Sequence, residues 1–231
     1  MSLVFIISAP SGSGKSTLVS AIKRLVDRLD FSVSYTTRPP RGSEEEGRDY
    51  YYTSRQVFER MIEQGEFLEY ADVFGNYYGT ARKFLDDARK RGHDLLLDID
   101  VQGASQLQAS LPDAISIFIL PPTKQELEKR LRRRSSAERV TDEAVIQRRL
   151  DTASREIEKY QKYDYILVND QLDDSIDALR AIILTERLRA SGRKPERADE
   201  EKLMELAESR RLERVRPYLG PILESFRKAT V

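Results

Sequence analysis

Cysteine and tryptophan are absent from this sequence of 231 residues, and histidine occurs once, as His93. Without cysteine, neither a disulfide framework nor a thiolate metal site can form, and a single histidine excludes a histidine-rich metal site. Net charge is also missing, because 39 Lys and Arg residues balance 39 Asp and Glu residues. The chain therefore lacks the overall field that draws proteins to nucleic acid or to an anionic membrane, and we expect neither partner.

Long apolar runs are missing as well. The N-terminal run, residues 3–7, is too short for a signal peptide or a membrane span, so the sequence predicts a soluble, cytoplasmic protein. Charged residues make up 34% of the chain, which is typical of many solvated helix faces. The length suffices for one sizeable core with room for inserted lobes.

The most informative stretch that is present is SAPSGSGKST, residues 8–17, between the first apolar run and an amphipathic segment that begins at Leu18. This order of strand, loop and helix is that of a phosphate-binding loop. Gly12 and Gly14 permit backbone angles at which successive N–H groups turn toward an anion, and the helix behind them adds its positive end. Lys15 supplies a charge for the β- and γ-phosphates, and the Ser16 hydroxyl can ligate Mg²⁺.

The motif departs from the strict pattern at one position, where Ala9 replaces the first glycine. A Gly/Ser-rich turn between two core elements is the alternative interpretation. The flanking strand and helix patterns favour the phosphate-binding loop.

Short apolar runs recur along the chain, and several lack the period-two alternation of half-exposed strands. They predict strands at residues 3–7, 31–35, 95–99, 115–120 and 165–168. Helical patterns lie between them, with one face formed by Leu18, Ile22, Leu25 and Val26, and another, within residues 175–188, by Ile176, Leu179, Ile182 and Ile183. Such alternation predicts right-handed βαβ crossovers and a parallel sheet, with ligands beyond the carboxyl ends of the strands.

Two segments interrupt this rhythm. Residues 36–78 are rich in Arg, Glu, Gly and Tyr and contain strand-like pieces at 50–52 and 67–70, so they predict a small inserted lobe. Residues 126–157 are highly charged and predict a helical cover over the site, with a loop near Ser135 and Ser136.

The character of the sequence changes again after Gly192. Residues 196–216 predict a charged amphipathic helix that Pro217 ends, followed by a turn or two at residues 222–226. The apolar positions of this helix include Leu203, Leu206 and Leu212, and such a stripe needs a partner. That partner is either a second copy of the chain, in a homo-oligomer, or the chain's own core.

Four segments together resemble guanylate kinase: the loop, SYTTRPPRGSEEEGRDYYY (34–52), GEFLEYADVFGNYYGT (65–80) and DIDVQGA (98–104). Agreement of several long motifs in order is far more specific than the loop alone. The resemblance implies an α/β fold in which a P-loop three-layer core with a parallel sheet comprises residues 1–33, 81–125 and 156–192. It further implies a GMP-binding lobe at 34–80 and a helical lid at 126–155, and it leaves residues 193–231 as a C-terminal helical extension.

The same resemblance implies that the chain phosphorylates GMP to GDP, with ATP as co-substrate and Mg²⁺ as cofactor. The ATP site would comprise Ala9, Pro10, Ser11, Gly12, Ser13, Gly14, Lys15, Ser16 and Thr17, with Asn169 near the adenine. The GMP phosphate would be held by Arg38, Arg41, Tyr50 and Tyr78. Two guanidinium forks can grip one phosphate with paired, charge-assisted bonds.

Base recognition falls to Glu69, which matches the family residue that accepts from guanine N1–H and N2–H₂; the hydroxyls of Ser34 and Thr80 complete it. Asp98 and Asp100 lie where a Walker-B-type acid belongs. One of them holds Mg²⁺ through water, and Asp98 also faces the acceptor nucleotide. Alternatively, either carboxylate caps the following helix.

The acceptor is already a nucleophile, so the reaction needs positioning and charge neutralisation rather than a base, and we interpret His93 as a loop residue. The resemblance assigns this catalytic role to Lys15, Arg38, Arg130, Arg134 and Arg149, with Arg38 bridging donor and acceptor. Arg133 and Ser135 stand where the family lid commonly has glycine. Which arginine of the run 132–134 enters the site is left open, although a solvated helix face accounts better for Arg132 and Arg133.

Two other functions remain as alternatives. A related P-loop kinase could act on a phosphorylated sugar such as ribose bisphosphate, but it has no reason to keep Ser34, Glu69 and Thr80 as a set. A guanylate-kinase-like interaction module without catalysis would typically lose loop residues such as Lys15, which is present here.

Overall fold

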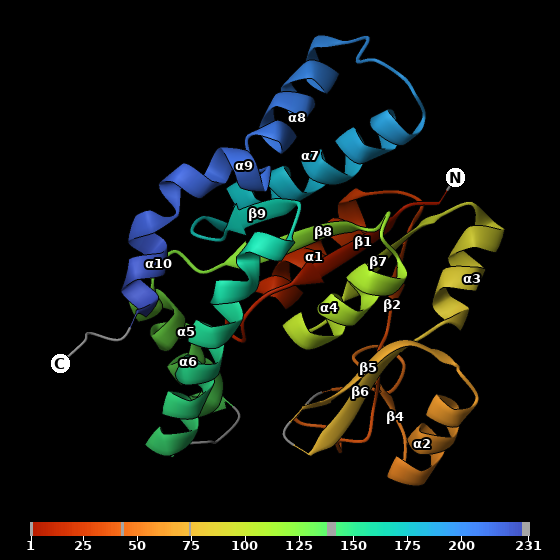
Figure 1. Ribbon diagram of the computed structural model, residues 1–231, viewed down its shortest axis with the longest axis vertical. Coiled ribbons are helices and arrows are strands. Elements are labelled where there is room, and N and C mark those ends of the chain that lie inside the picture. The colour runs from red at the N-terminus through yellow and green to blue at the C-terminus, as the bar shows by residue number, and fades with distance from the viewer. Residues whose placement is uncertain (1, 43, 74, 138–141, 228–231) are drawn as a thin grey trace. The chain divides into compact units, whose positions relative to one another are not determined.

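The computed structural model describes residues 2–42, 44–73, 75–137 and 142–227, which fall into two compact units (Figure 1). Unit 1 comprises residues up to 7 and 28–115, and unit 2 comprises residues 8–27 and those from 116 onward. The main sheet has the strand order β2-β7-β1-β8-β9. Its strands are β1 (Val4–Ser8), β2 (Leu29–Ser32), β7 (Asp94–Asp98), β8 (Ile115–Leu120) and β9 (Tyr165–Val168).

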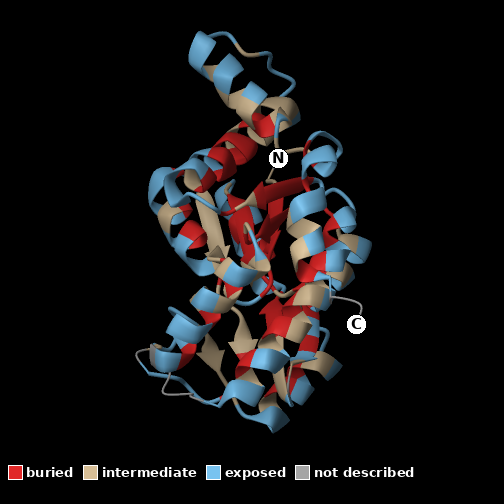
Figure 2. Cartoon of the chain, turned by 90° about the vertical axis from the view of Figure 1, so that its left-hand side faces the viewer, coloured by how far each residue is buried: buried red, intermediate tan, exposed pale blue. Residues whose placement is uncertain are grey.

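Parallel pairing is observed between β1 and β7, between β2 and β7, and between β8 and β9. β1, β7, β8 and β9 are among the most buried parts of the chain (Figure 2), which explains why their sequences show no alternation, whereas β2 is only partly buried. The α/β class and the parallel sheet are therefore confirmed. The finer domain bounds stay a prediction.

The strand predicted at residues 31–35 is wrong in one respect, because two strands of different sheets share this run. β2 ends at Ser32, whereas Tyr35 begins β3 (Tyr35–Thr36) of a second sheet. Between them the carbonyl of Ser34 accepts a hydrogen bond from the Tyr51 amide at 2.9 Å. Both short pieces are apolar, so the pattern alone merges them.

The second sheet of unit 1 has the order β4-β3-β6-β5, with β4 (Tyr51–Tyr52), β5 (Phe67–Val73) and β6 (Asn76–Ala81). Its core contains Phe58, from α2 (Arg55–Glu63), together with Phe67. Gly79 of β6 lies against both rings, since a Cβ there would approach each to 2.9 Å. The strands predicted near 50–52 and 67–70 are thus confirmed. α3 (Lys83–Arg91) and α4 (Val101–Ser110) complete unit 1.

In unit 2, α1 (Lys15–Leu25) packs on α7 (Leu172–Ala190), and the buried residues of α1 are Leu18, Val19 and Ile22. The sequence predicted Leu25 on this buried face, and that prediction is wrong. Leu25 lies at the end of the helix and is 54% exposed. Val26 directly follows the helix and is buried.

The break predicted near Ser135 and Ser136 is placed too early. α5 (Lys124–Ala137) continues through both serines, and α6 (Glu143–Ile157) packs against it and leads into a 3₁₀ helix at Glu158–Lys162. Serine often breaks helices because its hydroxyl competes for the main chain. Here the Ser136 hydroxyl donates to the Arg132 carbonyl at 3.0 Å, and Ser135 is buried with a hydrogen bond from Arg149.

The single helix predicted over residues 196–216 is interrupted. α8 (Ala198–Glu208) is followed by a turn, α9 (Leu212–Val215), a 3₁₀ helix at Arg216–Tyr218 and α10 (Gly220–Phe226). The turn pairs with the edge strand β9, since the Ile166 amide donates to the Arg210 carbonyl and the Leu212 amide donates to Asp164, both at 2.9 Å. An uncovered edge strand offers unpaired main-chain groups, and this turn covers them.

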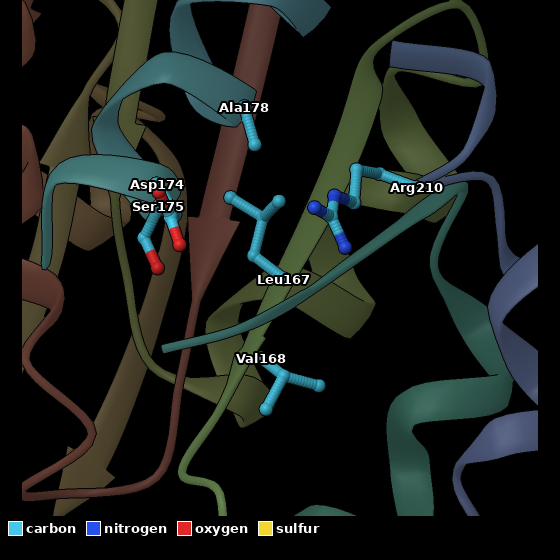
Figure 3. Close-up of a pocket in the computed structure, with 6 residues that line it drawn as sticks. All are labelled: Leu167, Val168, Asp174, Ser175, Ala178 and Arg210. Carbon is cyan, nitrogen blue, oxygen red and sulfur yellow. The ribbon is translucent and has the colours of Figure 1, made fainter. Parts of the chain in front are cut away.

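Three contacts fix this C-terminal extension to the rest of unit 2: α8 packs on α7, α9 packs on β9, and α10 packs on α5. Arg210 extends beside β9, where it lines a cavity of about 20 Å³ with Leu167 and Asp174 (Figure 3). The extension thus packs on its own core, as the second alternative predicted, and a homo-oligomer stays a prediction. Among the helices of the described ranges, none combines the length and apolar character needed to cross a bilayer.

A largely buried carboxylate, that of Glu186, reinforces the same junction. Glu186 of α7, only 13% exposed, accepts hydrogen bonds from Arg189 at 2.6 Å and from Arg211 at 2.8 Å, and also from the Tyr165 hydroxyl. Arg189 in turn pairs with Glu208 at the end of α8. One carboxylate therefore links α7, β9 and the extension.

Candidate nucleotide site in two halves

The phosphate-binding loop of unit 2 has the backbone that its sequence predicts. Gly12 and Gly14 adopt φ values of 89° and 90°, in the left-handed region that favours glycine. Gly14 precedes the first turn of α1, and no side chain of the described residues caps that helix. The Ser13 hydroxyl is buried without a hydrogen-bond partner in the described part of the chain. Uncapped amides at a helix start and a buried hydroxyl suit an anionic ligand.

Asn169 and Arg130 hold this loop by its main chain. The Asn169 amide donates to the Ser13 carbonyl at 2.7 Å, and Arg130 donates to the same carbonyl at 3.5 Å and to the Asn169 carbonyl at 3.1 Å. A Cβ at Gly14 would lie 2.3 Å from Nδ2 of Asn169. The structure therefore brings Ser13, Gly14, Arg130 and Asn169 together. Besides its positive φ, this close approach of Asn169 requires glycine at position 14.

Other predicted ATP-site residues take positions consistent with a loop that opens to solvent on one side. Ala9 and Pro10 are buried, and the Pro10 carbonyl accepts from the Ser13 amide at 3.1 Å. Lys15 is half-buried at the first position of α1. The remaining three, Ser11, Ser16 and Thr17, are exposed.

The lid arginines differ in their partners. Arg149 of α6 donates to the Ser135 hydroxyl at 3.2 Å, so the serine that stands where glycine was expected positions an arginine. Arg134 is exposed on α5. Arg132 pairs with Glu128 at 2.7 Å and with Glu143 at 2.5 Å on the surface, which confirms the solvated interpretation for that residue.

In unit 1, Arg38 is the centre of a cluster of polar and aromatic groups. It is 5% exposed, and its Nη2 donates to both carboxylate oxygens of Glu44 at 2.9 Å. Its Nε donates to the Tyr78 hydroxyl at 3.0 Å, and its guanidinium carbon lies 5.2 Å from the ring centre of Tyr50. Burial acts to lower the pKa of Arg38, but the hydrogen bonds to Glu44 and Tyr78 outweigh it and raise the pKa. The cation is thus firmly maintained.

Glu44 and Tyr52 are site residues that sequence reasoning missed. Besides Arg38, the Glu44 carboxylate accepts from the Arg41 amide at 2.8 Å and from the Tyr52 hydroxyl at 2.9 Å. Burial and this bond to Glu44 raise the pKa of Tyr52 to about 12. An anion therefore already sits where these donors converge. Glu44 begins a run of three glutamates, and nothing in the sequence distinguishes it from the other two.

Two of the three residues predicted for the base, Glu69 and Thr80, lie on the second sheet of unit 1. Glu69 of β5 is 5% exposed and directly opposes Thr80 of β6, whose hydroxyl donates to Oε1 at 2.6 Å. Ser34 is half-buried in the link between the two sheets, and the Arg41 side chain is exposed. Burial, followed by the nearby charge of Asp98, raises the pKa of Tyr50, so Asp98 belongs to the Arg38 neighbourhood.

Asp100 caps α4, as one of its two interpretations predicted. Its carboxylate accepts from the amides of Gln102 at 2.7 Å and Gly103 at 2.8 Å. His93 lies in a loop, as expected, and its Nδ1 is 3.0 Å from Asp30.

A family model described as guanylate kinase matches residues 1–186. A guanylate kinase of Koribacter versatilis (strain Ellin345) is 51% identical over 227 residues, which cover 98% of this chain and 97% of that protein. A guanylate kinase of Syntrophotalea carbinolica is 49% identical over 190 residues, or 82% of this chain and 88% of that protein. The Koribacter alignment thus reaches through most of the C-terminal extension.

Structural similarity agrees. The crystal structure of guanylate kinase from Anaplasma phagocytophilum matches with a TM-score of 0.65 and 35% identity, covering 80% of this chain and 86% of that chain. The loop geometry, the arginine and tyrosine cluster, the buried glutamate and these relatives all point to one assignment: the chain belongs to the guanylate kinase family.

Proposed function

We propose that this chain transfers the γ-phosphoryl group of ATP to the phosphate of GMP, giving ADP and GDP. The observation that carries the proposal is the buried Glu69 carboxylate, held by Thr80 in the same unit as the Arg38 cluster. A buried carboxylate of this kind suits the adjacent N1–H and N2–H₂ donors of guanine, whereas a sugar phosphate acceptor would have no use for it.

The donor nucleotide belongs to the loop of unit 2. The amides that begin α1 bind the phosphates, and Lys15 neutralises the β- and γ-phosphate charge. Arg130 and Asn169 keep the loop in shape through the Ser13 carbonyl.

Mg²⁺ fits the oxygen donors of the predicted metal residues, which are Ser16, Asp98 and Asp100. The described residues contain no cluster of three or more His, Cys, Asp or Glu side chains able to hold a metal, and Mg²⁺ bound to phosphates commonly uses only one or two protein ligands besides water. When bound, the ion neutralises phosphate charge. The Ser16 hydroxyl would be a direct ligand, and one of the two carboxylates would act through water.

The acceptor phosphate belongs to the Arg38 cluster. It would replace the Glu44 carboxylate at the Arg38 guanidinium, with Tyr50, Tyr78 and the Arg41 side chain as further donors. Exchange of one anion for another preserves the neutralisation of a buried cation, which would otherwise be costly.

The chemical step needs no proton abstraction. With a second pKa near ~6, a phosphate monoester is mostly dianionic at neutral pH. One of its oxygens attacks the γ-phosphorus, and the bond from that phosphorus to the β,γ-bridging oxygen breaks, so that ADP leaves with the electron pair. Lys15, Arg38 and the lid arginines Arg130, Arg134 and Arg149 offset the charge that spreads over the transferred group.

A coupled assay of ADP release tests the proposal, with GMP, AMP, UMP and a ribose bisphosphate offered in parallel in the presence of ATP and Mg²⁺. We expect turnover with GMP and little with the other three. Turnover of the ribose bisphosphate alone would identify the related sugar kinase, and no turnover with any acceptor would favour the interaction module. Location in the cytoplasm stays a prediction.

A further inference from the structure

Gly103, in the first turn of α4, has no part in the proposed reaction, yet its side-chain position is crowded. A Cβ at this residue would lie 2.3 Å from Oε2 and 2.9 Å from Cδ of Glu69. The backbone gives no reason for glycine, because Gly103 is not among the residues with positive φ. What requires glycine here is the close approach of the helix to the Glu69 carboxylate.

The helix is held in that place by a second contact one turn later. Gln106 reaches the edge strand β5, where its Nε2 donates to the Tyr70 carbonyl at 2.8 Å and its Oε1 accepts from the Tyr70 amide at 3.4 Å. Tyr70 is the residue that follows Glu69. The first turn of α4 is therefore fixed against the very part of β5 that carries the glutamate, and it cannot retreat without losing both hydrogen bonds.

The Glu69 side chain has a defined position of its own. It is 5% exposed, and its Oε1 accepts the Thr80 hydroxyl bond at 2.6 Å. An added methyl group at Gly103 would meet the end of this side chain, which is easier to displace than a helix anchored by the Gln106 side chain to the main chain of Tyr70. The carboxylate, and not α4, would shift.

We propose that Gly103 is a specificity-determining positioning residue, whose missing side chain sets where the Glu69 carboxylate lies and thereby selects purine monophosphates that carry a 2-amino group beside N1–H. The inference rests on the proposed role of Glu69. The most direct comparison is between GMP and IMP, because hypoxanthine keeps N1–H and lacks only the 2-amino group.

The experiment compares Gly103→Ala with Gly220→Ala. Gly220 also lies in a helix without positive φ, but a Cβ there meets nothing within 4 Å. GMP and IMP binding are measured by calorimetry without ATP, and KM and kcat are measured in the coupled assay. For Gly103→Ala we expect the preference for GMP over IMP to fall by about 10-fold to 100-fold, the range for a hydrogen bond to a charged group. KM for GMP should rise, while KM for ATP stays unchanged; Gly220→Ala should match the wild type in all of these.

A folded Gly103→Ala chain with the wild-type preference for GMP over IMP would overturn the inference. If that variant does not fold, Gln106→Ala decides, because it removes the anchor of α4 without adding bulk. Gln106→Ala should lower the same preference for GMP over IMP. An unchanged preference would then refute the proposal that the position of α4 sets the position of the Glu69 carboxylate. Because binding is measured without ATP, a wild-type chain that prefers GMP yet transfers no phosphoryl group would contradict only the proposed function. A wild-type chain without preference would overturn the inference itself.

Discussion

Glu69→Gln is the substitution that most directly tests base recognition. In the wild type, Oε1 accepts the Thr80 hydroxyl bond at 2.6 Å, and the side chain is nearly isosteric with glutamine. If the glutamine carbonyl keeps the bond to Thr80, its NH₂ group faces the N1–H and N2–H₂ donors of guanine. Donors then oppose donors where a charged acceptor stood before.

The size of the loss follows from these bonds. Each hydrogen bond to a charged group contributes about 1.5–3 kcal/mol, and at least one is lost. The value of kcat/KM falls tenfold for each 1.36 kcal/mol of transition-state stabilisation that is lost, so kcat/KM for GMP should fall by about 10²-fold, or more if both bonds are lost. Stability should change little, because the glutamine carbonyl still accepts from Thr80. The coupled assay gives kcat/KM for GMP, and calorimetry gives the Kd for ATP, which should not change.

Glu63→Gln is the matched control, since it makes the same chemical change at an exposed position at the end of α2 in the same unit. It should leave both values at those of the wild type. A Glu69→Gln chain that turns over GMP as fast as the Glu63→Gln chain would refute the assignment of Glu69 to guanine. Loss of ATP binding in Glu69→Gln would instead indicate a general structural defect.

Three further outcomes follow from the second unit. Gly14→Ala should raise the Kd for ATP in calorimetry by about 10-fold or more, because its Cβ would lie 2.3 Å from the side-chain amide of Asn169. Gly192→Ala is the control, since Gly192 has φ 68° but open space around it. That variant should carry only backbone strain of about 1–3 kcal/mol and bind ATP normally. Arg149→Ala should lower kcat by about 10²-fold or more, in line with arginines that contact a transferred phosphoryl group. Arg132→Ala removes only surface ion pairs, so its kcat should stay within about twofold of the wild-type value. Equal effects of the two substitutions would contradict the catalytic role of Arg149. Glu186→Ala should lower the free energy of unfolding by about 2 kcal/mol in urea titration, because it removes the charged hydrogen bonds from Arg189 and Arg211, while Glu208 still pairs with both arginines; a loss below about 1 kcal/mol would count against that role.

Features that depend on local sequence were predictable. The phosphate-binding loop needs glycines at fixed places between a strand and a helix, and the structure gives Gly12 and Gly14 the expected left-handed backbone. The parallel strands were predictable because burial on both faces removes alternation from their sequences. For the base and phosphate residues, the resemblance supplied the assignment, and the fold brings Arg38, Tyr50 and Tyr78 together as it implied.

Features that depend on distant contacts were not predictable. The run at residues 31–35 changes from one sheet to the other because the Tyr51 amide binds the Ser34 carbonyl. The C-terminal helix breaks after Glu208 because the next residues pair with β9. Glu44 is one of three consecutive glutamates, and only the fold shows that it, rather than the other two, accepts from Arg38. In the first two cases the decisive partner is remote in sequence; in the third it is only six residues away, and the folded path of the chain decides which glutamate reaches it.

The glycines show most clearly how position decides what a motif letter means. Ala9 replaces the first glycine of the loop motif, yet it is buried just after β1 and is not among the residues with positive φ, so a methyl group there is tolerated. Gly12 and Gly14 have φ near 90°, and Gly14 is also pressed against Asn169, so both need glycine. Gly103 has ordinary helical geometry and needs glycine only because Glu69 lies beside it. A motif therefore records the backbone requirement, whereas the steric requirement that places the base-recognising carboxylate appears only in the folded chain.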